Sequence, residues 1–158
     1  MAKKIVLAII VLMLVPIAFV GVVLLWPFDL VALPKCPLPA GVSAFRRFDD
    51  VPPQLVHALT QRVGEIVPVG ARFDATDVVF IGPGKFRRLI FIWSRNNRWV
   101  VATEHGGFAY NDPVFAFQIE GNGREAVFLR EEIAWPASIC STASGLLDVV
   151  RSPDSSED

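Results

Sequence analysis

The stretch RLIFIWSRNNRWVVATEH, residues 88–105, decides how this chain folds. It contains two runs, 88–94 and 99–105, that are rich in the β-branched and aromatic residues typical of strands. Asn96 and Asn97 lie between the runs, and asparagine tolerates the positive φ that a tight hairpin turn requires. The stretch therefore predicts an antiparallel β-hairpin.

A turn at these two asparagines determines which residues of the hairpin face each other. The predicted cross-strand pairs are Trp93 with Val100, Phe91 with Ala102, Ser94 with Trp99, Ile92 with Val101 and Ile90 with Thr103. Both faces are largely apolar, so we expect the hairpin to lie centrally in a sheet that is covered on each side. The register also places Arg95 opposite Arg98, an unfavourable like-charge pair unless the loop is longer or an anionic group lies at the hairpin tip.

A second hairpin is predicted from residues 114–120 and 124–130, which flank the sequence GNG at 121–123. If the last two residues of that sequence form the turn, one face carries an apolar stripe with the pairs Ile119–Ala126 and Phe117–Phe128. A three-residue loop with a bulge would instead pair Glu120 with Arg124. The aromatic stripe favours the first register.

The segment ahead of the hairpins has the spacing of a helix. Asp50 is suited to cap this helix, two prolines suit its first turn, and Pro68 ends it; its apolar residues are Leu55, Val56, Leu59, Val63, Ile66 and Val67. Three short stretches complete the pattern: 42–48 as an edge strand, 78–81 as a strand, and 146–150 as a final strand or helical turn. Together these elements predict an α+β fold in which one helix packs on an antiparallel β-meander of about four to six strands.

The N-terminal region is apolar enough to cross a membrane. Residues 5–28 are all apolar or small, and Lys3 and Lys4 precede them. A helix rises about 1.5 Å per residue, so this run exceeds the ~20 residues that span a hydrocarbon core of about 30 Å. A cleaved secretory signal has only ~7 to 15 apolar residues and a small-x-small cleavage site, which is not found here. We therefore expect a retained transmembrane signal anchor rather than a cleaved leader.

The two cysteines, Cys36 and Cys140, enclose nearly all of the chain that follows the apolar run. This spacing favours a disulfide that closes a domain in an oxidising compartment; two unrelated buried thiols are the alternative. A disulfide would place the domain outside the cytoplasmic membrane, with the N-terminus in the cytoplasm. The expected parts are a cytoplasmic N-terminus at 1–4, the anchor at 5–28, a juxtamembrane linker at 29–35, the α+β domain at 36–151 and a disordered acidic tail at 152–158.

Charge and motifs exclude several classes of partner and cofactor. The chain has 15 lysines and arginines against 16 acidic residues, whereas a nucleic-acid-binding surface has a clustered basic excess. Residues 104–112 offer one histidine and two carboxylates within a few positions, whereas a zinc site normally has three or four well-spaced ligands. No complete phosphate-binding loop is present in the sequence. We therefore expect no nucleic-acid partner, no metal and no cofactor.

The connection between the two hairpins, EHGGFAYNDP at 104–113, is the richest in side chains that are capable of chemistry. Long connections carry function more often than short ones. We therefore expect ligand-binding residues here: Glu104, His105, Tyr110, Asn111 and Asp112. A second interpretation is catalytic, with a carboxylate of this loop orienting His105 as a general base. A third is a structural turn, because glycine, asparagine and proline are turn residues.

The sequence favours a binding function over catalysis. No serine lies in the Gly-x-Ser-x-Gly context that marks a nucleophile, so we expect no catalytic residues. The expected protein is a single-pass, membrane-anchored extracytoplasmic domain that binds a protein, a lipid or another component of the cell envelope, or acts as an accessory subunit. The alternative is a small membrane-anchored hydrolase or other enzyme that uses His105.

Overall fold

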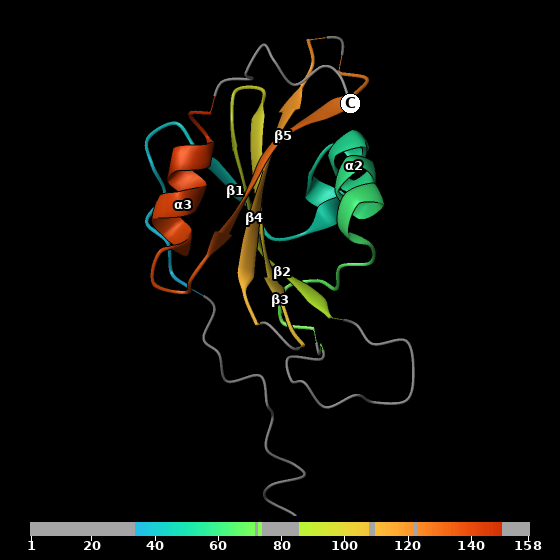
Figure 1. Cartoon of the computed structure of the whole chain (residues 1–158). Coiled ribbons are helices and arrows are strands. Elements are labelled where there is room, and N and C mark those ends of the chain that lie inside the picture. Colours follow the sequence, from blue (N-terminus) through green and yellow to red (C-terminus); the bar gives the residue numbers. More distant parts are fainter. Residues whose placement is uncertain (1–33, 72, 74–85, 108–109, 122, 150–158) are drawn as a thin grey trace, which may run out of the picture. The chain divides into compact units, whose positions relative to one another are not determined.

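The structure, a computed structural model, describes residues 34–71, 73, 86–107, 110–121 and 123–149. Figure 1 shows a β-sheet with a helix on each face. The sheet has five strands: β1 (Ser43–Phe45), β2 (Arg87–Arg95), β3 (Arg98–His105), β4 (Asp112–Ile119) and β5 (Ala126–Ala134). Each strand pairs antiparallel with the next along the chain, so the sheet is a meander with β1 and β5 at its edges.

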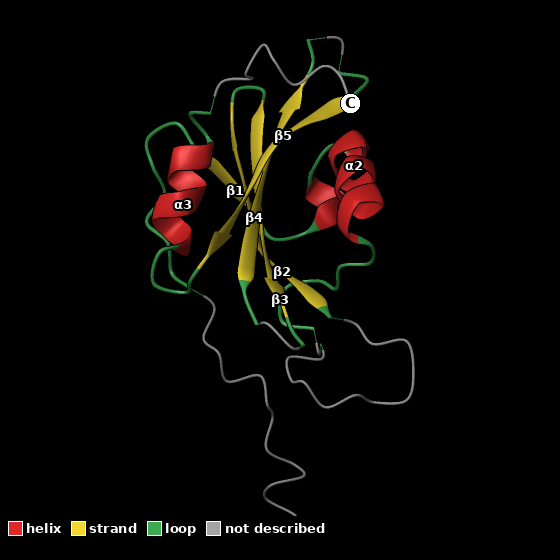
Figure 2. Ribbon diagram, in the orientation of Figure 1, coloured by secondary structure: helices red, strands yellow, loops and turns green. Residues whose placement is uncertain are grey.

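In the described part of the chain, two α-helices cover the sheet (Figure 2). A short 3-10 helix, η1 (Phe48–Asp50), precedes α2 (Pro53–Val63), and α3 (Ile139–Leu146) follows β5. α3 contacts β3, β4 and β5, whereas α2 lies on the other face of the sheet and contacts β5. The domain therefore has three layers: helix, sheet and helix.

Each helix covers its own apolar core, because successive side chains of a strand point to opposite faces. The core under α3 contains Ile90, Phe91, Trp93, Val100, Ala102, Val114, Ala116, Ala134, Ile139, Ala143, Leu146 and Leu147. The core under α2 contains Val51, Leu55, Leu59, Leu89, Ile92, Trp99, Val101, Phe115 and Phe117. The prediction that the first hairpin is central and covered on both faces is thus confirmed.

The predicted fold class is wrong. The predicted fold has a transmembrane helix followed by one helix on the sheet, but the described chain has two α-helices on opposite faces of the sheet. None of the described helices is long and apolar enough to cross a membrane. The predicted span at 5–28 lies outside the described residues, as do the strand predicted at 78–81 and the tail at 152–158. The unpredicted helix is α3, whose sequence ICSTASGL contains serine, threonine and glycine, all weaker helix formers than alanine.

α2 is shorter than predicted. The predicted cap, Asp50, belongs to η1 instead, and no side chain caps the start of α2. α2 ends early because Gly64 has a φ of 80°, which takes the backbone out of the helical region. Val67, predicted as helical, forms a parallel bridge with Arg88 of β2. The last apolar residue of the predicted helix therefore pairs with β2 and does not belong to α2.

The first hairpin has the predicted register with one correction. Trp93, Phe91, Ser94 and Ile92 have the predicted partners, but Thr103 pairs with Leu89 and not with Ile90. The cause is a bulge in β2 between Leu89 and Phe91. The bulge directs both Ile90 and Phe91 into the core under α3.

The tip of this hairpin has the predicted like-charge pair. Arg95 faces Arg98, and Asn96 of the turn has a φ of 57°. The anionic group that the sequence requires is Asp148, which forms an ion pair with Arg95. The repulsion between the two arginines is therefore relieved by a residue that follows α3.

Three further predictions are confirmed. β1 lies within the predicted edge strand at 42–48. The second hairpin has the register of the apolar stripe, because Ile119 pairs with Ala126 and Phe117 with Phe128. Cys36 and Cys140 form a disulfide with a Cα–Cα distance of 5.3 Å, which joins the segment before β1 to α3.

Candidate functional site

The five predicted ligand-binding residues separate between the two faces of the sheet. Glu104 and His105 are neighbours on β3, so their side chains point to opposite faces. Ala102 belongs to the core under α3, which places Glu104 on the α3 side and His105 on the α2 side. The residues that were predicted to form one binding loop therefore lie in two groups, one on each face of the sheet.

Glu104 forms a buried ion pair with Arg88. The guanidinium Nε and Nη2 each lie 2.9 Å from Glu104 Oε1, and both side chains are 3% exposed. Tyr110 donates its hydroxyl to Glu104 Oε2 at 3.1 Å. Burial and the negative charge of Glu104 raise the pKa of Tyr110, so this hydroxyl stays protonated and remains a donor. Glu104 is thus bound on both oxygens.

Arg88 has further partners that hold it in place. Its Nη1 donates to the carbonyl oxygen of Ala71 at 3.2 Å, and its guanidinium carbon lies 4.3 Å from the centroid of the Phe73 ring. Arg88 is absent from the predicted site because a register without a bulge would place it opposite His105. The bulge in β2 moves it opposite Glu104.

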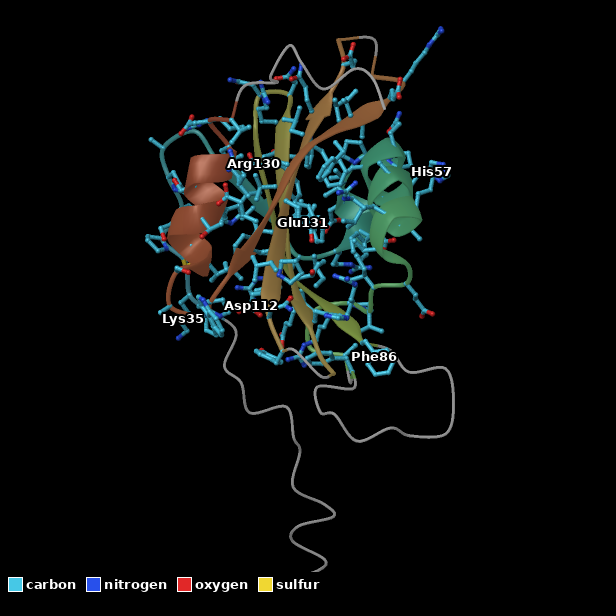
Figure 3. The ribbon with its side chains drawn as sticks, viewed as in Figure 1. Lys35, His57, Phe86, Asp112, Arg130 and Glu131 are labelled. Carbon is cyan, nitrogen blue, oxygen red and sulfur yellow. A yellow bond between two sulfur atoms is a disulfide. The ribbon has the colours of Figure 1, made fainter. Side chains whose placement is uncertain are left out.

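Asp112 is the first residue of β4, at the end of the sheet that is remote from the turn between β2 and β3 (Figure 3). The register of β3 and β4 pairs Ala102 with Val114 and continues in the bridge between His105 and Asn111, so Glu104 faces Asp112. Asp112 is 3% exposed, and its Oδ1 has no hydrogen-bond partner among the described residues. Burial and the charge of Glu104 raise the pKa of Asp112 to about 6.

Among the described residues, a cation and not a carboxylate lies opposite His105. His105 faces Arg87 across the β2–β3 pair, and burial together with that positive charge lowers the pKa of His105. No carboxylate in the described chain contacts its imidazole. The backbone of His105 pairs with Asn111, with N–O distances of 2.8 and 3.1 Å. His105 and Asn111 therefore continue the β3–β4 ladder.

A cavity of about 210 Å³ lies elsewhere, on the α3 side of β2. It is lined by Pro34, Lys35, Cys36, Leu38, Ala44, Phe45, Arg46, Ile90, Phe91 and Trp93. α3 packs over β3, β4 and β5, and the segment 34–42 supplies Cys36 and Val42 against the same core. The disulfide of Cys36 fixes one wall of the cavity to α3.

The cavity has an aromatic floor and a cationic rim. Phe91 and Trp93 are buried and stack with their ring centroids 4.6 Å apart. Lys35 and Arg46 are exposed and supply all the charge of the lining. Figure 3 shows Lys35 on the α3 side. Sequence reasoning missed this cavity because residues 34–46 and 90–93 meet only in the folded sheet.

No described group of histidines, cysteines and carboxylates is arranged to hold a metal ion. Comparison of the chain with family models, with curated proteins and with solved structures finds no match in any of the three. Function is therefore inferred from the geometry of the sites themselves.

Proposed function

We propose that this chain is a non-enzymatic binding domain of the cell envelope, located outside the cytoplasmic membrane, and that its ligand binds in the cavity beside β1 and β2. The disulfide between Cys36 and Cys140 supports an oxidising compartment, because disulfides persist there and are rare in the cytosol. The apolar run at 5–28 supports a location at the membrane.

One observation carries the proposal of binding without catalysis: the chemistry of the cavity lining. The lining contains no histidine, carboxylate or hydroxyl side chain, and its cysteine is in the disulfide. A buried aromatic floor with a few charged groups at the opening is typical of a ligand site. Apart from Lys35, which is exposed at the rim, the lining has no side chain of the kinds that serve in acid–base or nucleophilic mechanisms.

The loop at 104–112 is a less favourable ligand site than the cavity. Glu104 is already bound by Arg88 and Tyr110, and these contacts bury it. His105 has no carboxylate partner in the described chain and lies on the other face from Asp112. Binding at this loop, and the alternative of an enzyme that uses His105, stay predictions.

Photolabelling tests the proposal. The full chain in phosphatidylcholine nanodiscs is exposed to three decyl probes that carry a diazirine on the chain and differ only in the head group: carboxylate, alcohol or trimethylammonium. We expect at least one probe to label the peptide that contains residues 90–93, in saturable fashion, as measured by mass spectrometry of the digest.

Two variants of β1 show whether the label is in the cavity. Ala44→Phe fills the cavity, because Ala44 lines it and faces Trp93, and should abolish the labelling. Ser43→Phe is the matched control: it is the same change one residue earlier on the same strand, outside the lining. The proposal would be contradicted if no probe labelled the peptide, or if Ala44→Phe left the labelling unchanged.

A further inference from the structure

We infer that the ligand of this cavity is an anionic amphiphile whose apolar end lies on Phe91 and Trp93 and whose carboxylate or phosphate head lies between Lys35 and Arg46. This inference depends on the proposed function and names the class of ligand. The chemistry belongs equally to a membrane lipid and to a free fatty acid.

The sign of the charge at the rim favours an anion. Lys35 and Arg46 both line the cavity, and no acidic residue does. Both cations are exposed, so they can reach a head group while their own stems cover apolar surface. No side chain of the lining neutralises these two cations, so an anionic ligand could do so.

The contrast with the other arginines strengthens this argument. Ion pairs with acidic side chains are formed by Arg47, Arg62, Arg88, Arg95 and Arg130. Neither Lys35 nor Arg46 has such a partner in the part of the chain that the structure describes. Arg46 and Arg47 are neighbours, yet only Arg47 is paired, with Asp49 at 3.0 Å. Arg46 is therefore available to an anion at the cavity.

The size of the cavity favours a ligand of which only the apolar end is enclosed over one that is enclosed as a whole. Pockets that enclose a drug-sized ligand have volumes of about 300–1,000 Å³. The volume here is about 210 Å³, and its floor is a stacked aromatic pair. An amphiphile fits these limits because only its apolar end must be enclosed, while its charged head stays at the rim in water.

The three decyl probes test the inference on the full chain in phosphatidylcholine nanodiscs. We expect the carboxylate to label residues 90–93 about 3- to 30-fold more efficiently than the alcohol, the range given by two partly exposed ion pairs, and the trimethylammonium probe to label least. Equal labelling by all three heads would overturn the inference and leave the proposed cavity intact. Absence of any cavity label would instead contradict the proposed function.

Matched double variants separate the rim from the overall charge. Lys35→Gln/Arg46→Gln should remove the preference for the carboxylate, so that the ratio of carboxylate labelling to alcohol labelling falls to about 1. The control, Arg47→Gln/Arg130→Gln, removes two exposed cations that do not line the cavity and should keep the carboxylate preference. Loss of the preference in the control, or its retention in the rim variant, would refute the role of Lys35 and Arg46.

A last arm distinguishes the two sources of the ligand. Diazirine-bearing phosphatidylglycerol or phosphatidylcholine replaces a small part of the nanodisc lipid. Labelling by phosphatidylglycerol alone supports a membrane lipid, whereas labelling only by the free carboxylate supports a fatty acid. Equal labelling by both lipids would count against recognition of the anionic head.

Discussion

Two regions on the α3 side of β2 hold their cations in opposite ways. Arg88 is buried and has partners on several sides, namely Glu104, Ala71 and Phe73. Lys35 and Arg46 lie exposed at the rim of a cavity and have no acidic partner in the described residues. In the first arrangement the charge of the arginine is neutralised inside the protein, whereas the second leaves positive charge available for a ligand.

Removal of the disulfide should have the largest effect on stability. Cys36 and Cys140 are separated by 104 positions, and a loop of about 100 residues corresponds to about 4 to 5 kcal/mol in the chain-entropy model. We expect Cys36→Ala/Cys140→Ala to lower the free energy of unfolding by that amount, measured by urea denaturation. It should also reduce cavity labelling, because the bond fixes one wall. A loss of less than about 1 kcal/mol would show that the packing of α3 alone holds that wall.

Breaking the buried ion pair should rank next. Arg88→Met leaves Glu104 buried without its cation, which typically costs about 3 to 5 kcal/mol. Arg88→Met/Glu104→Leu should recover most of that loss, because neither charge remains. The exposed pair of Arg130 and Glu132 supplies the control: Arg130→Met should cost less than about 1 kcal/mol in the same urea titration. Similar losses for the two single variants would remove the distinction between the regions.

Asp112 tests whether the buried region tolerates a second negative charge. Its pKa rises from 3.8 to about 6 on folding, so the folded state binds this proton more tightly than the unfolded state. The stabilisation is present at low pH and is lost as the pH rises from about 4 to about 6.

Asp112→Asn removes this dependence on pH. We expect the variant to be about 1 to 3 kcal/mol more stable than the parent at pH 7.5, and close to it at pH 4, by thermal and urea unfolding. Asp148→Asn, which lies on the surface, is the control. A stability difference that is the same at both pH values would mean that Asp112 titrates normally.

The ion pair at the hairpin tip should give the smallest effect. Asp148 is 72% exposed and Arg95 is 29% exposed, so Asp148→Asn should cost less than about 1 kcal/mol. Salt screens exposed charges, and this small cost should therefore disappear at high ionic strength, whereas the cost of Arg88→Met should persist. A salt-independent loss for Asp148→Asn would place the tip with the buried region.

The sequence predicted the parts of the sheet where one face differs from the other or where a turn sets the register. Asn96 with its flanking runs was sufficient for four of the five pairs of the first hairpin. The bulge was not predictable from the alternation of apolar and polar residues. Leu89, Ile90 and Phe91 are all apolar, so the sequence does not show which of them faces which side of the sheet. That shift by one residue is also the reason that Arg88 was absent from the predicted site.

α3 and the cavity could not be predicted for different reasons. Only the spacing of Ile139, Ala143 and Leu146 indicates the helix, and its eight residues are too few for that pattern to be distinctive. The cavity depends on the place where the segment 34–38 lies against β2, which is a tertiary contact. The cysteines were the one signal that connected these regions, and their pairing was predicted correctly.

The position of the disulfide also orders the assembly of the domain. Every strand pairs with its neighbour in sequence, so each hairpin can close through local contacts. In the folded domain Cys36 and Cys140 are held together by the pairing of β1 with β2 and by the packing of α3 on β3, β4 and β5. Oxidation should therefore follow sheet formation and act as a latch, so that the oxidised bond marks chains whose folding is complete.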